Sequence, residues 1–384
     1  MVVSCDPITV ERLQAFAITA KPSVGPISSL GNMPVRNGLL VAITSHDGIT
    51  GWGEIWCNFP PQGNLNRLNL LNDVIGPELI GMRFSDVWSA RAKLEQKFAR
   101  LAIHTGEFGS FAHCFAGIDT ALFEIAAKSK GLSTARFLNP NTLKTVPTYA
   151  STPNVADLEA SLTDIMANGH TSIKLKLGHG IASDRALVDG VSELGEAALT
   201  VYADANQNWS LKQAIASLYA LSDVPLGFIE EPLRADAPLA DWKTLSEATS
   251  IPVAAGENIT SRQSFSDFLT HGGLKVVQPD VAKWGGTSGA FNVGQFAKTT
   301  GASCFMHFMG SGLGLAASMQ VLAAINHSGA VELDSNPNPL RTDLGDIDLS
   351  ITEGVLQVPQ GNGHGFQPDR RALSKFSCGE IELR

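Results

Sequence analysis

The sequence predicts an α/β protein whose larger part is a closed barrel of eight parallel strands. Between residues 174 and 332 one pattern occurs seven times: a short apolar run rich in β-branched residues ends in a polar residue, and a helical segment follows. Successive run endings lie roughly 23 to 28 residues apart, about the length of one strand-plus-helix unit with its loops. Continuous apolar runs are typical of parallel strands buried on both faces.

The seven runs share an ending in Lys, Asp, Glu or His, with Ser and Thr absent. In chain order the residues at these endings are Lys174 and Lys176, Asp204 and Asn206, Glu230 and Glu231, Glu257, Asp280, His307, and Glu332 with Asp334. The segment V-P-T-Y-A-S at residues 146–151 supplies an eighth strand, the first in order. Barrel enzymes carry their chemistry at the C-terminal ends of the strands. Single charges at strand ends are often only solvated, but a complete ring of them indicates a site.

The residues before the barrel predict a separate α+β unit. Residues 8–20 alternate as a strand does, residues 21–37 are rich in Gly, Pro, Ser and Asn and predict an irregular loop, and residues 38–56 predict a hairpin that turns at His46, Asp47 and Gly48. Helices are expected over residues 66–82, 86–100 and 110–130. Because these strands precede the helices rather than alternating with them, the unit is distinct from the barrel.

Seven helices are expected between the barrel strands, so the larger domain is a modified TIM barrel of the (β/α)7β type. Their ranges are 155–168, 183–197, 211–222, 237–248, 261–270, 286–299 and 313–326. The expected N-caps are Asn154, Ser183, Ser210 and Ser261. The tail is too short for another domain and is expected to pack on the N-terminal unit, completing it. The predicted domains are a capping domain (1–130), the barrel with the site (131–345) and the tail (346–384).

Composition excludes several classes of partner. Of 384 residues, 44% are apolar and 17% charged, as in a soluble globular protein, and the net charge of -9 argues against nucleic acid or an anionic membrane surface. The five cysteines have no C-x-x-C spacing, which favours reduced thiols. With no signal peptide and no apolar run of about 18 residues, we expect a cytoplasmic protein without a membrane span.

Three carboxylates at neighbouring strand ends predict a metal site. Asp204, one of Glu230 and Glu231, and Glu257 would repel one another when buried unless a cation neutralised them. Glu230 and Glu231 are adjacent on a strand and point to opposite sides, so only one can bind the ion, and the other is expected to pair with a neighbouring Lys or Arg. Oxygen-only ligands suit a hard ion, and Mg²⁺ leaves positions for water and substrate.

The remaining ring residues predict proton transfer. Lys174 and Lys176 lie at i and i+2, so both project toward the barrel axis, where like charge and burial would lower the pKa of a lysine. His307, held by Asp280, is an oriented acid/base, and Glu332 could hydrogen-bond a substrate carboxylate. A cation between a lysine and a histidine favours removal of the α-proton of a carboxylate, giving an enediolate.

The chain resembles the mandelate racemase subgroup of the enolase superfamily over essentially its full length. The matching motifs are G-W-G-E ending at Glu54, K-L-K at 174–176, D-A-N-Q-N-W from Asp204, I-E-E-P from Ile229, G-E-N from Gly256, Q-P-D from Gln278, His307 with the following S-G-L-G-L-A-A-S, and V-E-L-D around Glu332. By this resemblance Asp204, Glu230 and Glu257 would bind Mg²⁺, with Asn206 as a nearby polar contact.

The same resemblance implies roles for the other ring residues. Lys176 would be the base on one face, with Lys174 beside it neutralising the substrate carboxylate. His307 with Asp280 would act on the other face, and Glu332 would be the electrophilic partner. The family's N-terminal domain caps the barrel mouth, so residues 21–37 and 56–59 would be substrate-reading loops, and the resemblance implies a homo-oligomer.

The product is left open by the sequence. With a leaving group β to the carboxylate the enzyme would be a hydro-lyase, a dehydratase of an acid sugar or related hydroxy acid; without one, Lys176 and His307 could racemise or epimerise an α-hydroxy or proline-type α-amino acid. The capping loops offer few basic residues, Lys21 and Arg36, for a diacid, whereas Trp56 and Phe59 could accept a ring-shaped substrate. A third hypothesis is a catalytically inactive binding protein. The intact ring argues against it, because a decayed site would be expected to lose at least one ligand or base.

Overall fold

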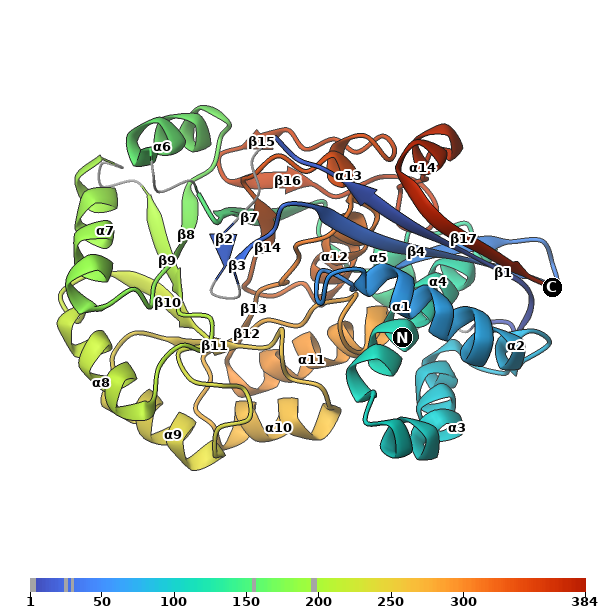
Figure 1. The fold of residues 1–384 in the computed structure, drawn as a ribbon, viewed down its shortest axis with the longest axis horizontal. Helices are drawn as coiled ribbons and strands as arrows, with labels where there is room; N and C mark the ends of the chain where they lie inside the picture. Colours follow the sequence, from blue (N-terminus) through green and yellow to red (C-terminus); the bar gives the residue numbers. More distant parts are fainter. Residues whose placement is uncertain (1–4, 24–26, 29–30, 154–156, 195–198) are drawn as a thin grey trace.

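The structure, a computed structural model, describes residues 5–23, 27–28, 31–153, 157–194 and 199–384. Figure 1 shows a barrel of strands ringed by helices at one end of the molecule and a long antiparallel sheet at the other. The predicted fold class is confirmed: an enolase-type barrel with an N-terminal antiparallel capping sheet that a C-terminal strand joins. The boundaries at residues 130 and 345 stay predictions.

The capping sheet combines both ends of the chain. Its order is β17 (Ser377–Leu383), β1 (Ile8–Ala20), β4 (Arg36–Ser45) and β5 (Thr50–Ile55), with β6 (Arg83–Phe84) also paired to β1. The hairpin β4–β5 turns where predicted, with Thr44 opposite Thr50 and Gly48 at φ 78°. The segment 21–37 is more regular than predicted, because β2 (Ile27–Ser28) and β3 (Gly31–Asn32) pair within it.

Helices cover one face of this sheet. They are α1 (Gly63–Leu70), a π-helical turn (Leu71–Ile75), α2 (Gly76–Leu79), a 3₁₀ turn (Val87–Ser89), α3 (Ala90–Thr105) and α4 (Phe108–Ser129). The single helix predicted over residues 66–82 is therefore interrupted and ends at Leu79. The long helix α4 lies against β5 at Gly51 and Gly53, where an added Cβ would stand 2.1 Å from the carbonyl oxygen of Ala121 and 2.0 Å from that of Gly117. The glycines of the G-W-G-E motif thus permit this close packing.

Eight parallel strands close the barrel. They are β7 (Thr145–Ser151), β8 (Ser172–Lys176), β9 (Thr200–Asp204), β10 (Leu226–Glu230), β11 (Val253–Ala255), β12 (Val276–Val277), β13 (Ser303–Cys304) and β14 (Val331–Asp334). Each pairs with the next from β7 to β13, and β14 pairs with β7. A parallel bridge between Met306 and Val331 joins the remaining edges. The predicted eight strands are confirmed.

Seven helices follow barrel strands, as predicted. They are α6 (Leu158–Ala167), α7 (Ile181–Leu194), α8 (Leu211–Ala220), α9 (Leu239–Ala248), α10 (Arg262–Thr270), α11 (Gly286–Thr300) and α12 (Gly312–Ile325), after a short α5 (Thr134–Leu138). Ser210 and Ser261 are N-caps, Ser210 in a capping box with Gln213. Ser183 is not a cap, because α7 already begins at Ile181. Asn154 lies outside the described residues.

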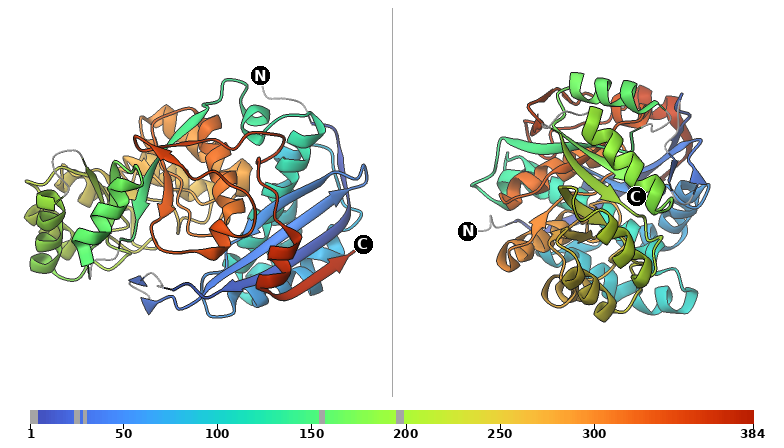
Figure 2. Two further views of the ribbon diagram at one scale, coloured as in Figure 1. Left: turned by 90° about the horizontal axis from the view of Figure 1, so that it is seen from above. Right: turned by 90° about the vertical axis from the view of Figure 1, so that its left-hand side faces the viewer.

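The tail divides between the two parts of the molecule. After α13 (Pro339–Thr342), the hairpin β15 (Ile351–Thr352) and β16 (Val355–Gln357) joins the barrel, where β16 pairs with β7. Only after α14 (Arg370–Phe376) does β17 reach the capping sheet, so the expectation that the whole tail packs on the N-terminal unit was partly wrong. Figure 2 shows β17 beside the blue strands of that sheet.

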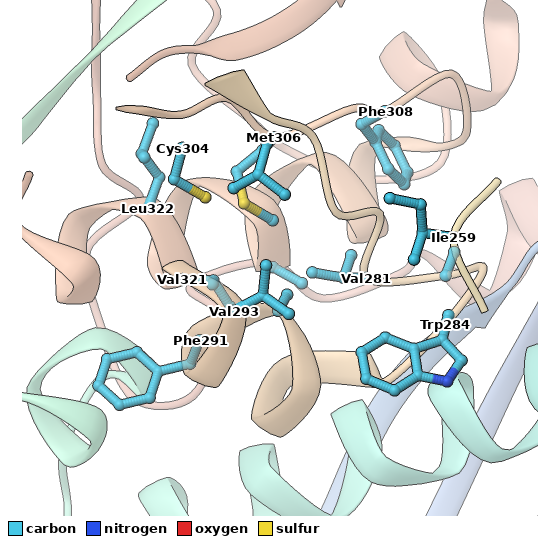
Figure 3. Close-up of a cluster of buried hydrophobic side chains, with 14 of the residues drawn as sticks. Ile259, Val281, Trp284, Phe291, Val293, Cys304, Met306, Phe308, Val321 and Leu322 are labelled. Atoms are coloured by element: carbon cyan, nitrogen blue, oxygen red, sulfur yellow. The ribbon is translucent and has the colours of Figure 1, made fainter. Parts of the chain in front are cut away.

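An apolar cluster fixes the segments that carry His307 and Asp280. Figure 3 shows Val281, Trp284 and Met306 in this cluster with side chains of α11 and α12. All three are nearly inaccessible to solvent. Because these neighbours are anchored among apolar side chains, the backbone that presents Asp280 and His307 is held in one place.

Candidate active site

The predicted site residues form a ring at the C-terminal ends of the barrel strands. Asp204 and Glu230 are the last residues of β9 and β10 and lie opposite each other in the sheet register, and Glu257 follows β11 by two residues. Lys176 ends β8, and His307 follows β13. Around the barrel, β9 to β12 separate β8 from β13 in one direction, and β7 and β14 separate them in the other. Lys176 and His307 therefore enter the ring from opposite sides of the barrel.

Each of the three carboxylates predicted to bind metal is tied to a lysine through one oxygen. Asp204 Oδ2 lies 2.5 Å from Lys176 Nζ, and Glu230 Oε2 lies 2.6 Å from Lys174 Nζ. Glu257 Oε2 lies 2.9 Å from the Nζ of a third lysine, Lys283. Five of these six side chains are at most 15% exposed; Lys176, at 22%, is the most open.

The lysine pKa values differ from the sequence-based expectation. Burial lowers the pKa of Lys174, but Glu230 and Glu332 outweigh it and hold this pKa well above its ordinary value. Burial likewise lowers the pKa of Lys176, and Asp204 raises it by more. The expectation of a lysine pKa lowered by like charge was wrong for this arrangement, because carboxylates outnumber lysines around the ring.

His307 and Asp280 form the expected pair. Nδ1 of the imidazole lies 2.7 Å from Asp280 Oδ2, and Nε2 lies 3.2 Å from Glu257 Oε2 and 3.7 Å from Glu332 Oε2. Burial lowers the pKa of His307, but Glu257, Glu332 and Asp280 together raise it to about 9. The Asp280 contact fixes which ring nitrogen faces the barrel interior.

Glu332 is closely enclosed on the side of β14. It accepts hydrogen bonds from Ser151 Oγ at 2.5 Å and from the Phe308 amide at 3.3 Å, and its Oε1 lies 2.7 Å from Lys174 Nζ. Burial raises its pKa, but Lys174 and His307 lower it to about 2 overall. Glu332 therefore joins the lysine face of the ring to the histidine face.

Glu231 turns away from Glu230 and has its own partner. Its two oxygens accept from Asn258 Nδ2 at 2.8 and 3.0 Å, and burial raises its pKa well above the ordinary value. The expectation of a Lys or Arg as its partner was therefore wrong, because the amide of Asn258 takes that place. Its φ of 38° places Glu231 in a left-handed backbone conformation directly after β10.

The three residues predicted to contact substrate lie in different surroundings. Asn206 is beside the ring: its backbone amide and Nδ2 donate to Asp204 at 2.7 and 2.9 Å. Arg36 is buried and forms an ion pair with Asp334, the last residue of β14. The ring of Trp56 lies against Lys283, whose Nζ is 4.7 Å from the ring centroid.

Lys283 is a residue of this ring that the sequence analysis missed, as is Gln278, whose Nε2 donates to Glu230 Oε2 at 2.6 Å. The apolar run that predicts the strand ends at Asp280, whereas Lys283 comes three residues later in Q-P-D-V-A-K. The turn that follows Asp280 returns Lys283 to the ring, because Asp280 Oδ1 accepts from the Ala282 amide at 2.7 Å. A polar residue at the end of such an Asx turn is the signal that could have identified it.

The donor set suits a hard divalent cation. All three predicted ligands are carboxylates, and the buried Glu230 Oε1 has no hydrogen-bond partner among the described residues. Lys174 Nζ lies within 2.6 Å of Glu230 and 3.9 Å of Asp204, so these two carboxylates face a common point. As placed, no group of three or more His, Cys, Asp or Glu side chains in the described ranges stands close enough to hold an ion. Binding a cation therefore requires rotation of carboxylates that the lysines now hold.

Two family models match the chain. "Enolase C-terminal domain-like" matches residues 157–372, and "Mandelate racemase / muconate lactonizing enzyme, N-terminal domain" matches residues 14–138. No helix among the described residues is long and apolar enough to cross a membrane.

Similar proteins extend over nearly the whole chain. A solved structure from Bordetella bronchiseptica, titled mandelate racemase/muconate lactonizing enzyme, is 37% identical with a TM-score of 0.89, covering 96% of this chain and 99% of that one. A D-galactarolactone cycloisomerase of Agrobacterium fabrum is 26% identical (89% of this chain, 91% of the relative), and an arabinonate dehydratase of Saccharolobus solfataricus is 25% identical (88% and 89%). The chain belongs to the mandelate racemase/muconate lactonizing enzyme family of the enolase superfamily, whose members act by α-proton abstraction and typically use a divalent metal such as Mg²⁺.

Proposed function

We propose that the protein is a Mg²⁺-dependent hydro-lyase that removes the α-proton of a small hydroxy acid, such as an acid sugar, and then eliminates water. The observation that carries this proposal is the pair of proton carriers on opposite sides of one ring. Lys176 ends β8, whereas Asp280 and His307, which form a pair, follow β12 and β13. Base and acid on opposite faces suit an elimination in which proton and hydroxide leave from different sides.

Asp204, Glu230 and Glu257 would hold the cation after rotating away from the lysines that now contact them. When bound, Mg²⁺ would supply positive charge that stabilises the enediolate formed from the substrate carboxylate. The unpaired Oε1 of Glu230 supports this assignment, because a buried carboxylate oxygen without a donor is costly.

The protein side chains would then divide the proton transfers. Asp204, once it holds a cation, would no longer stabilise the ammonium of Lys176, which lowers the pKa of the lysine and lets its neutral amine take the α-proton at Nζ. His307 donates its Nε2 proton to the departing β-hydroxyl, which leaves as water, while Asp280 stabilises the imidazolium that precedes this step. Lys174 neutralises the substrate carboxylate, and Glu332 strengthens a hydrogen bond to it as charge develops. The enol product tautomerises to a 2-keto acid.

Racemisation or epimerisation is the second candidate, and the same opposed pair supports it. If no leaving group stands β to the carboxylate, Lys176 could take the α-proton from one face and His307 Nε2 could return one to the other. An L-Ala-D/L-Glu epimerase of Bacillus subtilis is 25% identical to this chain, so both reaction types occur among its relatives.

A product assay separates the two candidates. The wild-type protein with Mg²⁺ is incubated with a library of acid sugars, α-hydroxy acids and cyclic α-amino acids, and each mixture is analysed for 2-keto acid and for inverted stereochemistry. Dehydration predicts 2-keto acid from at least one acid sugar. If the α-carbon of some acid is inverted and no acid in the library yields a 2-keto acid, the protein is a racemase or epimerase and not a dehydratase.

A further inference from the structure

The third lysine of the ring has contacts that differ from those of the other two. Lys283 is 9% exposed, and its Nζ lies 2.9 Å from Glu257 Oε2 and 2.8 Å from Asn258 Oδ1. The same ammonium stands 4.7 Å from the ring centroid of Trp56, within the range of a cation–π interaction. A lysine ammonium has three N–H donors. Two carboxamide or carboxylate oxygens and one aromatic face account for them, so Lys283 is not poised to take a substrate proton.

The contacts of Lys283 run in two directions. Toward the ring, it donates to Oε2 of Glu257. It also holds Asn258, whose Nδ2 in turn binds both oxygens of Glu231. Lys283 therefore helps to orient two neighbouring acidic side chains: Glu257 directly, on the oxygen that His307 Nε2 also approaches at 3.2 Å, and Glu231 through Asn258.

Toward the capping domain, Lys283 meets the segment after β5. The Trp56 amide donates to the Ala282 carbonyl at 3.1 Å, so this segment is docked on the turn that carries Lys283. Two further side chains pack near Trp56: the ring centroid of His113 lies 5.0 Å from that of Trp56, and the Arg67 guanidinium carbon lies 5.8 Å from the same centroid. Because Trp56 is fixed on several sides, it gives Lys283 a rigid support.

We propose that Lys283 is a positioning residue that orients Glu257 for cation binding and couples this orientation to docking of the capping domain through Trp56. The proposal rests on the proposed function only in that Glu257 is a cation ligand. Groups that orient a metal ligand typically contribute about 10- to 100-fold to metal affinity.

The charge of Lys283 acts in the opposite direction, which makes the idea testable. An ammonium near a cation site repels the cation, so its removal would tighten binding if charge were its only influence. Loss of the oriented hydrogen bond would weaken binding instead. The two effects therefore predict opposite signs for one substitution.

The experiment measures Mn²⁺ binding by electron paramagnetic resonance without substrate, and hence without any activity. Lys283→Met is compared with wild type and with Lys243→Met, a matched control whose exposed lysine lies 3.9 Å from Glu247 on the surface. We expect Mn²⁺ affinity about 10- to 100-fold weaker in Lys283→Met and unchanged in Lys243→Met. Lys283→Gln, which keeps a donor but no charge, is expected to lie between wild type and Lys283→Met.

Affinity that is unchanged or tighter in both Lys283 variants would overturn the inference. Circular dichroism and the melting temperature of the cation-free protein establish that each variant is folded; if Lys283→Met is not, the comparison of Lys283→Gln with wild type decides. Failure of the proposed cation site looks different, because then the wild-type protein itself would bind no Mn²⁺; failure of the dehydration reaction alone leaves Mn²⁺ binding in place and is read from the product assay.

Discussion

Single side chains of the ring are stabilised by pairing. Each of Asp204, Glu230 and Glu257 has a lysine partner, and His307 has Asp280. Buried ions are tolerated only when such partners compensate for lost hydration. The pairs also make the acids directional, because each lysine contacts one carboxylate oxygen; the second oxygen of Glu230 has no partner among the described residues, whereas that of Asp204 accepts from the Asn206 amide.

Asp280→Asn tests the orientation of His307. The substituted side chain would retain the shape of the aspartate, but its neutral amide could not stabilise an imidazolium at Nδ1 as a carboxylate does. We expect the rate of the step that uses His307 to fall at least about 100-fold, with Lys176-dependent exchange retained. The measurement is α-proton exchange in ²H₂O by nuclear magnetic resonance on whichever acid is turned over. Wild-type rates on the His307 face would contradict the assigned role.

The sequence predicted which residues line the ring better than it predicted their charge states. Strand periodicity placed Lys174, Lys176 and Asp204 at strand ends because alternation and β-branching are local properties. The lysine pKa values depend on how many carboxylates converge from distant strands, and a linear sequence does not contain that count. Lys283 was missed for a related reason, since a turn, not a strand end, brings it to the ring.

The elements of the two domains are joined by buried carboxylates that meet helix N-termini. Glu54, at the end of the G-W-G-E motif in β5, accepts from the amides of Ser311 and Gly314 at the start of α12. Asp119 on α4 accepts from the amide and hydroxyl of Ser288 at the start of α11, each at 2.8 Å. Unsatisfied amides at helix N-termini favour such acceptors. The capping domain is thereby fixed to the two helices that support the His307 side of the barrel.

Gly53→Ala tests the packing of β5 against α4. The added methyl would stand 2.0 Å from the Gly117 carbonyl oxygen, so backbone must move, and we expect a loss of about 3 kcal/mol in the free energy of unfolding. Urea denaturation followed by circular dichroism measures this.

Gly190→Ala is the matched control for that substitution. Gly190 lies within α7, and its nearest neighbour to an added Cβ is 3.6 Å away, an ordinary contact. We expect the free energy of unfolding of Gly190→Ala to equal that of wild type or to exceed it by up to about 1 kcal/mol. Equal losses in both variants would show that the clash at Gly53 is not the cause.

Asp119 gives the domain contact a pH dependence. Burial raises its pKa to about 7 although the Ser288 hydrogen bonds lower it, whereas the unfolded value is about 3.9. The folded state therefore binds the proton more tightly; this contribution is complete below about pH 4 and is lost as pH rises through about 7. The side chain of Asp119→Asn does not titrate. The melting temperature of this variant should therefore rise relative to that of wild type as the pH increases from about 5 to about 8. A constant difference across that range would contradict the assignment.

Several barrel helices were predicted to within two residues, because an apolar face is visible in sequence. The range 211–222 was observed as Leu211–Ala220 and 286–299 as Gly286–Thr300. Errors fell where tertiary contacts decide: the π-helical turn Leu71–Ile75 divides one expected helix, and the strand β16 pairs with β7 rather than with the capping domain. Such choices depend on partners far away in the chain.

The whole molecule places its proposed cation site where the barrel meets a domain built from both chain ends. A ligand that binds only the folded protein stabilises it, by about 2.7 kcal/mol at roughly 100 times its dissociation constant. We therefore expect EDTA to lower the melting temperature and excess Mg²⁺ to restore it. Glu230→Gln should abolish most of the response. A similar rise with NaCl at equal ionic strength would indicate general screening instead.

The most direct test of the account is α-proton exchange in ²H₂O, measured for wild type, Lys176→Ala and His307→Asn on the same acid library with Mg²⁺. The account predicts exchange by wild type on at least one acid, and loss of exchange on one face in each variant: the face served by Lys176 in the first and by His307 in the second. Stabilisation by Mg²⁺ with no exchange on any acid would favour a binding protein and contradict the account. Identical exchange in all three proteins would equally contradict it.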